Sequence, residues 1–160
     1  NFMHDGNLGY LIRSAACFGA ECVHVIGSVP PPHKLKALSG TLLEYVQIKQ
    51  HSNPTQFLEH IRENDIKLIS AEINDEATPL NQYGFNFRTP ICIVVGHEQV
   101  GIPVELIQNS DSVFISMPGV GYCLNTAQAG NIMLYEASKQ YEARARFSEE
   151  WISECYIHHP

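Results

Sequence analysis

The chain has 160 residues, of which 44% are hydrophobic and 17% are charged, and this suits one globular domain with a sizeable core. It contains no apolar run of the roughly 18 residues that a membrane helix needs, so no membrane-spanning segment is expected. The formal net charge of −7 is opposite in sign to that of most nucleic-acid-binding surfaces. An RNA site would therefore need a local basic patch or completion by a second subunit.

The first predicted element is a helix that begins within residues 5–13. Four apolar residues share one face at the spacing i, i+3, i+4 and i+7: Leu8, Leu11, Ile12 and Ala15. Asn7 can cap this helix. Arg13 is the only charged residue between positions 6 and 20, and it lies on a second, mildly polar face. Taken alone, the two polar residues fit a plain cap and a solvated charge. In a functional interpretation, the guanidinium of Arg13 lies beside a bound phosphate.

The rest of the chain alternates short apolar runs with amphipathic stretches. Strands are predicted at residues 22–26, 45–49, 66–71, 91–95 and 112–116. Helices are predicted at 54–64, between 103 and 109, and at 125–147, with a last short helix that begins at 148. Breaks are expected around residues 30–32 and in a polar loop through Tyr83. This alternation is typical of an α/β fold with a parallel sheet flanked by helices, in one domain over residues 1–160.

The strongest predicted strand leads into the segment Gly-His-Glu-Gln-Val-Gly-Ile-Pro at residues 96–103. Ligands of parallel α/β sheets bind beyond the carboxyl ends of the strands, and glycines permit close backbone approach there. The segment lacks the Lys and Ser or Thr of a P-loop, and residue 101 is Gly where the zinc motif HExxH has its second His. Two interpretations of Glu98 stay open: a functional carboxylate, or a loop carboxylate that accepts hydrogen bonds from nearby amides.

A glycine-rich bend joins the last predicted strand to the long helix. Its glycines, Gly119 and Gly121, do not complete the dinucleotide-binding pattern GxGxxG, because Leu124 occupies the third position. Asn125 can cap the helix, whose first amides then face the bend. The next turns hold small residues such as Gly130, which allow another element to pack closely. Individually, these residues are more typical of a core than of a site.

The cysteines and histidines give no sign of a metal site. Five cysteines are scattered without CxxC spacing: Cys17, Cys22, Cys92, Cys123 and Cys155. Their odd number and spacing favour a reducing compartment, and we expect the cytoplasm. The eight histidines show no ligand spacing. The sequence opens at Asn1 without a Met, so we expect the native chain to have further residues before it.

Three segments in order carry a family resemblance. They are Asn-Leu-Gly-x-x-x-Arg at 7–13, Gly-x-Glu-x-x-Gly-Ile-Pro at 96–103, and Met-Pro…Leu-Asn…Leu-Tyr-Glu at 117–136. Together they resemble the three motifs of the SpoU (also called TrmH) family of RNA 2′-O-ribose methyltransferases, which belongs to the knotted SPOUT superfamily. Residues 36–40 are also similar to a family segment. The resemblance extends from residue 1 to about residue 141.

The resemblance implies a parallel α/β fold with a C-terminal trefoil knot and a homodimer with active sites at its interface. It also implies S-adenosylmethionine as the cofactor, bound largely by backbone groups. Three residues match the family's cofactor-contacting positions: Gly96, Met117 and Leu124. Four match its functional polar positions: Asn7, Arg13, Glu98 and Asn125.

The implied reaction transfers a methyl group to a ribose 2′-OH of tRNA or rRNA, without a metal. The family's proposed base is the arginine that Arg13 matches, assisted by an RNA phosphate. Because arginine is nearly always protonated, a role in holding the phosphate and polarising the hydroxyl fits Arg13 equally well.

Two features depart from the family pattern. Cys123 replaces a serine that the family places two residues before the asparagine of its third motif. The bend at 118–123 is also about two residues shorter than usual. A thiol is a weaker hydrogen-bonding group than a hydroxyl, so a contact to RNA or cofactor depends on this position. The alternative functions are therefore a non-catalytic cofactor- or RNA-binding dimer of the same fold, and methylation of a substrate other than RNA.

Overall fold

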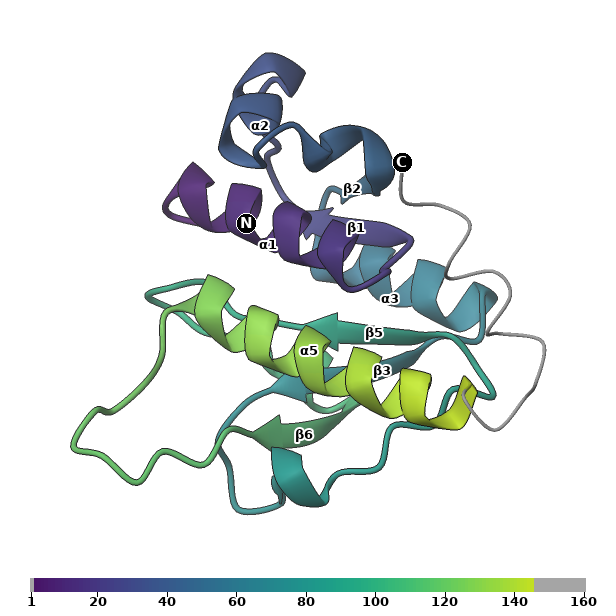
Figure 1. The fold of residues 1–160 in the computed structure, drawn as a ribbon, viewed down its shortest axis with the longest axis vertical. Helices are drawn as coiled ribbons and strands as arrows, with labels where there is room; N and C mark the ends of the chain where they lie inside the picture. Colours follow the sequence, from purple (N-terminus) through teal and green to yellow (C-terminus); the bar gives the residue numbers. More distant parts are fainter. Residues whose placement is uncertain (1, 146–160) are drawn as a thin grey trace.

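The computed structural model describes residues 2–145 (Figure 1). Its helices are α1 (Asp5–Cys17), α2 (Pro32–Leu38), α3 (Pro54–Glu63), α4 (Val104–Ile107) and α5 (Thr126–Ala145), with short 3-10 turns η1 (Leu42–Tyr45) and η2 (Leu80–Gln82). Its strands are β1 (Cys22–Ile26), β2 (Gln47–His51), β3 (Lys67–Ala71), β4 (Thr78–Pro79), β5 (Ile91–Val94) and β6 (Ser110–Phe114). The last short helix that the sequence predicts, and Cys155, lie outside the described residues.

All paired strands run parallel, as predicted. β1 pairs with β2, and the other four form a sheet in the order β4-β6-β3-β5. Neighbouring strands in this sheet are not consecutive in the chain, so helices and loops cross over between them. Within residues 2–145, no helix combines the length and the apolar character that a membrane crossing requires.

Helices cover both faces of the four-stranded sheet. Successive side chains of a strand point to opposite faces, and β3 shows this directly. Leu68 packs with Leu58 of α3, whereas Ile69 packs with Met133 of α5. Figure 1 shows α5 lying across one face of β3 and β5. A third cluster joins α1, β1 and α2, and it includes Leu8, Ile12, Val25 and Leu35.

Glycines allow α1 to approach its neighbours closely. A Cβ atom on Gly9 would collide with Leu38 at the end of α2, and one on Gly130 of α5 would collide with Leu11 of α1. All four residues of the predicted apolar face of α1 are buried. The expectation that Gly130 permits close packing is confirmed. Helix α1 therefore connects the β1–β2 unit to α5.

Several predicted boundaries are wrong. The strand predicted at 45–49 begins at residue 47, because register with β1 starts at Gln47, whereas Tyr45 ends η1 and is 75% exposed. The strand predicted at 112–116 lies at 110–114, where pairing with β3 places Ser110 opposite Leu68. The break expected at residues 30–32 leads into a helix that the sequence analysis does not predict, α2, which has Pro32 in its first turn. The polar loop holds β4 and η2. The trefoil knot stays a prediction.

Candidate functional site

One buried asparagine connects all three motif segments. The side-chain amide of Asn7 donates to Oε1 of Glu98 at 2.5 Å, and its Oδ1 accepts from Nδ2 of Asn125 at 3.1 Å. Oδ1 of Asn125 in turn accepts from the backbone N–H of Ala127 at 2.9 Å and of Gln128 at 3.3 Å. The predicted cap at Asn125 is thereby confirmed. Asn7 lies 91 residues from Glu98 and 118 from Asn125, so this chain of hydrogen bonds is wholly tertiary.

The prediction that Asn7 caps α1 is wrong. The helix begins at Asp5, its N-cap residue is His4, and no side chain caps it. Asn7 lies inside the first turn and is only 7% exposed. A buried amide needs partners for both its donor and its acceptor, and Glu98 and Asn125 provide them.

The carboxylate of Glu98 accepts hydrogen bonds from residues at and just before the start of α1. In addition to Asn7, it accepts from the backbone N–H of Met3 at 2.8 Å and of His4 at 3.3 Å. Burial acts to raise the pKa of Glu98, but hydrogen bonds from these groups and from its own amide outweigh it and lower the pKa to about 2. Glu98 is therefore anionic at neutral pH and poorly suited to accept a proton. Of the two interpretations left open by the sequence, this geometry fits the amide-binding loop carboxylate.

Gly96 lies in a turn with no room for a side chain. A Cβ atom there would approach the carbonyl carbon of Gly101 to 2.6 Å. The turn is closed by two backbone hydrogen bonds: His97 N–H donates to the Gly101 carbonyl at 3.0 Å, and Gly101 N–H donates to the His97 carbonyl at 2.9 Å. Gly101 has φ +70°, a conformation that favours glycine. The backbone at the end of β5 is thus fixed closely enough to exclude any other residue at position 96.

Arg13 lies outside this hydrogen-bonded chain. It is exposed on α1, and its guanidinium packs against Gly40, where a Cβ atom would come within 2.9 Å of Nη1. Gly40 and Thr41 both have positive φ, so two successive left-handed residues shape this turn. Among the described residues, Arg13 makes no hydrogen bond or ion pair. Within residues 2–145, its donors therefore have no protein acceptor.

The loop between β6 and α5 carries the remaining predicted residues. In Figure 1 it extends away from the sheet before it returns to α5. Met117 and Leu124 are partly buried at its two ends, whereas Cys123 is exposed and carries a free thiol. The structure therefore does not bring Cys123 into the hydrogen-bonded chain of Asn7, Glu98 and Asn125.

Comparison with known proteins assigns the chain to a family. Residues 1–135 match the SpoU rRNA methylase family. The chain belongs to that family. It is 25% identical over 148 residues to the tRNA (guanosine(18)-2′-O)-methyltransferase of Escherichia coli K12, covering 90% of this chain and 62% of that protein. It is 32% identical over 140 residues to the 23S rRNA (guanosine-2′-O-)-methyltransferase RlmB of Acinetobacter baylyi, covering 84% of this chain and 55% of that protein. The chain thus spans less than two thirds of these relatives.

Solved structures of SpoU-type proteins share the fold. An AdoMet-bound rRNA methyltransferase from Sinorhizobium meliloti superposes with a TM-score of 0.77 at 25% identity, over 85% of this chain and 52% of the other. The A. aeolicus TrmH/SpoU tRNA-modifying enzyme superposes with a TM-score of 0.79 at 22% identity, over 97% of this chain and 81% of the other. The second likeness concerns the fold alone.

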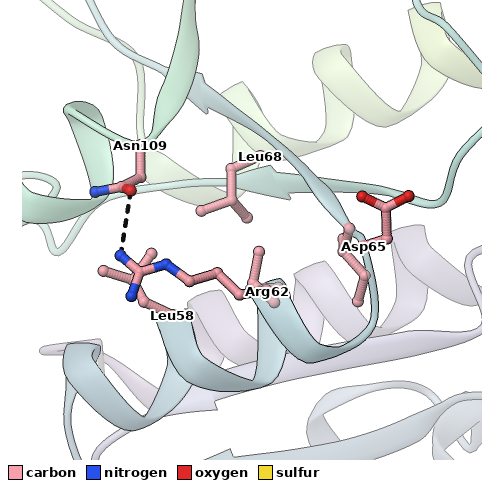
Figure 2. Close-up of a pocket in the computed structure, with 7 residues that line it drawn as sticks. Leu58, Arg62, Asp65, Leu68 and Asn109 are labelled. Carbon is pink, nitrogen blue, oxygen red and sulfur yellow. Dashed lines mark hydrogen bonds between the residues drawn. The ribbon is translucent and has the colours of Figure 1, made fainter.

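One hollow in the described part of this SpoU-family chain lies away from the motif segments. It has a volume of about 280 Å³ and lies between the end of α3 and the start of β3 and β6, with none of the predicted site residues in its lining. Figure 2 shows Arg62 in its wall, with Nη2 donating to Oδ1 of Asn109 at 3.4 Å. Arg62 thus has a partner among residues 2–145, where Arg13 has none.

Sequence spacing missed a cluster of three histidines from β1, β2 and α3. Nδ1 of His24 and Nε2 of His51 lie 2.9 Å apart, and the ring of His60 lies 5.2 Å and 5.4 Å from theirs. Two nitrogens on one tetrahedral zinc ion are separated by roughly 3.3 Å, so 2.9 Å indicates a direct N–H···N hydrogen bond. Among the described residues, no group of three or more His, Cys, Asp or Glu is arranged to hold a metal ion. His24 and His51 are therefore hydrogen-bonded to each other, and the partly buried ring of His60 packs beside them.

Proposed function

We propose that the protein transfers a methyl group from S-adenosylmethionine to a ribose 2′-OH of tRNA or rRNA. The observation that carries this proposal is the contact of all three motif segments of a SpoU-family chain through Asn7. The relatives named above methylate tRNA or rRNA, which supports RNA as the substrate class.

The predicted cofactor positions fit a ligand that is held by backbone groups. The Gly96 backbone has no space for a side chain, and partly buried Met117 and Leu124 flank the loop that leads to α5. These three residues would hold the cofactor, which supplies the transferable methyl group. The AdoMet-bound structures of the S. meliloti protein and of the SpoU methyltransferase AviRb from Streptomyces viridochromogenes support this assignment.

The charges of the site favour Arg13 as the group that contacts RNA. Glu98 is anionic and accepts hydrogen bonds from three other residues, so it is a poor proton acceptor. Arg13 is exposed and has free donors, which suit bidentate contact with a phosphate. A guanidinium that also donates to the ribose 2′-OH would make this hydroxyl more acidic and position it for in-line transfer. The proton then leaves toward the phosphate or solvent.

A homodimer completes this proposal. The lysines of the neighbouring helix α2 do not add free positive charge beside Arg13, since Lys34 pairs with Asp5 at 2.5 Å and Lys36 with Glu44 at 2.5 Å. Arg13 also lies outside the chain formed by Asn7, Glu98 and Asn125. A second copy of the protein, although itself acidic, would bring the local positive charge of its Arg13 to this site.

The test is methyl transfer from radiolabelled S-adenosylmethionine to bulk tRNA and rRNA, followed by alkaline hydrolysis. Label in alkali-resistant dinucleotides is expected, because a 2′-O-methyl group blocks cleavage at that ribose. Cofactor binding without transfer to RNA would instead favour the non-catalytic alternative, which the exposed position of Cys123 also allows. Label in a substrate other than RNA would contradict both.

A further inference from the structure

Two successive residues at the start of α5 each hold a different motif segment. Asn125 contacts Asn7 of the first segment, as described above. The next residue, Thr126, is partly buried, and its hydroxyl donates to the carbonyl oxygen of Gly96 at 2.7 Å. The sequence does not single out Thr126, since a hydroxyl residue in the first turn of a helix is common.

We propose that Thr126 is a positioning residue for the cofactor, because its hydroxyl fixes the Gly96 peptide relative to Leu124. This inference rests on the proposed function. It concerns a residue that lies within the third segment but is not one of the motif residues named above.

The Gly96–His97 peptide group is held at both ends. Its carbonyl accepts from Thr126, and its N–H donates to the carbonyl of Gly101. Removal of the Thr126 hydroxyl would leave this peptide attached only to its own turn. The orientation of this peptide group toward a ligand would then no longer be fixed by α5.

The same hydrogen bond fixes the spacing of the two backbone positions proposed to bind the cofactor. Leu124 is two residues before Thr126, so their Cα atoms are separated by at most about 7 Å. Thr126 therefore holds Leu124 close to Gly96, although 28 residues separate them in the chain. A pocket made of backbone groups depends on such spacing, because it has few side chains that could adjust.

A plain capping role does not account for the Thr126 hydroxyl. The side chain of Asn125 already accepts from the first amides of α5, those of Ala127 and Gln128. The hydroxyl of Thr126 points instead to a different segment, at the carboxyl end of β5. Its loss should therefore affect ligand binding more than helix formation.

The experiment compares Thr126→Val, which keeps the shape and removes the hydroxyl, with Thr126→Ser, which keeps the hydroxyl. Binding of S-adenosylmethionine and S-adenosylhomocysteine to the full chain is measured by titration calorimetry. Thr126→Val is expected to raise Kd roughly tenfold, with KM for the cofactor raised and kcat much less affected. Thr126→Ser is expected to bind within about twofold of the unchanged protein. Thr55→Val, in the exposed first turn of α3, is the matched control.

Two results overturn the inference. Equal affinities of Thr126→Val and the unchanged protein would show that the hydroxyl does not position the cofactor. Equal weakening by Val and Ser would show that the packing of the whole side chain, and not the hydroxyl in particular, determines cofactor affinity. If the unchanged protein binds neither S-adenosylmethionine nor S-adenosylhomocysteine, the proposed function itself fails. If it binds them and Thr126→Val binds them equally well, only the inference about Thr126 fails.

Discussion

Replacement of Asn7 tests whether the motif segments depend on one buried side chain. Asn7→Ala removes both hydrogen bonds, one to the charged oxygen of Glu98 and one from the neutral amide of Asn125. Asn7→Asp keeps the size of the side chain but places a second carboxylate against Glu98. In the unchanged protein, the Asn7 amide donates to Glu98 at a distance of 2.5 Å. The two variants therefore separate the loss of hydrogen bonds from the gain of repulsion.

The expected magnitudes follow from these contacts. A hydrogen bond to a charged group contributes about 1.5–3 kcal/mol and a neutral one about 0.5–1.5 kcal/mol. Glu98 keeps its backbone donors and Asn125 can turn to water, so Asn7→Ala should lower the free energy of unfolding by about 2–3 kcal/mol. Asn7→Asp should cost more at pH 8 than at pH 5. Two adjacent carboxylates raise the pKa of the pair, and a group with a raised pKa in the folded state loses stability as pH rises.

Urea unfolding followed by circular dichroism at pH 5 and pH 8 measures both effects. Asn86→Asp is the matched control, because Asn86 is exposed and, among the described residues, accepts a hydrogen bond only from the backbone N–H of Arg88. Its unfolding midpoint should stay near that of the unchanged protein at both pH values. The reasoning is refuted if Asn7→Ala is as stable as the control, or if Asn7→Asp shows no greater loss at pH 8.

Three further predictions concern single side chains. Arg13→Ala should reduce methyl transfer by roughly 100-fold or more and leave cofactor binding within about twofold. The control variant Arg62→Ala should keep methyl transfer. If Arg13→Ala loses both methyl transfer and cofactor binding, Arg13 has a structural role. Cys123→Ser should be tolerated in the transfer assay, and inactivation would show that the thiol has its own role. Burial and then the charges of His51 and its neighbours lower the pKa of His24 from 6.5 to about 4. The folded state therefore binds fewer protons than the unfolded state, so thermal stability should fall as pH drops from about 6.5 to 4. His24→Asn should flatten this fall, and an unchanged slope would contradict the assignment.

The sequence by itself determined the elements whose signals are local. The apolar face of α1, the cap and first proline of α3, and the apolar core of β5 follow from side-chain periodicity and capping chemistry within a few residues. The order of the three motifs also predicted the family, since it needs no knowledge of contacts. The parallel α/β class followed from the alternation of elements.

Only the tertiary structure decided what the polar side chains contact. Asn7 has the chemistry of a cap, but its partners lie 91 and 118 residues away, and burial demands that both ends of its amide be paired. The same holds for the pairing of Thr126 with Gly96 and for the three histidines brought together by β1, β2 and α3. Strand register likewise depended on partner strands, which shifted β6 by two residues. The spacing of residues along the chain does not predict such contacts, because they form only when distant segments pack together.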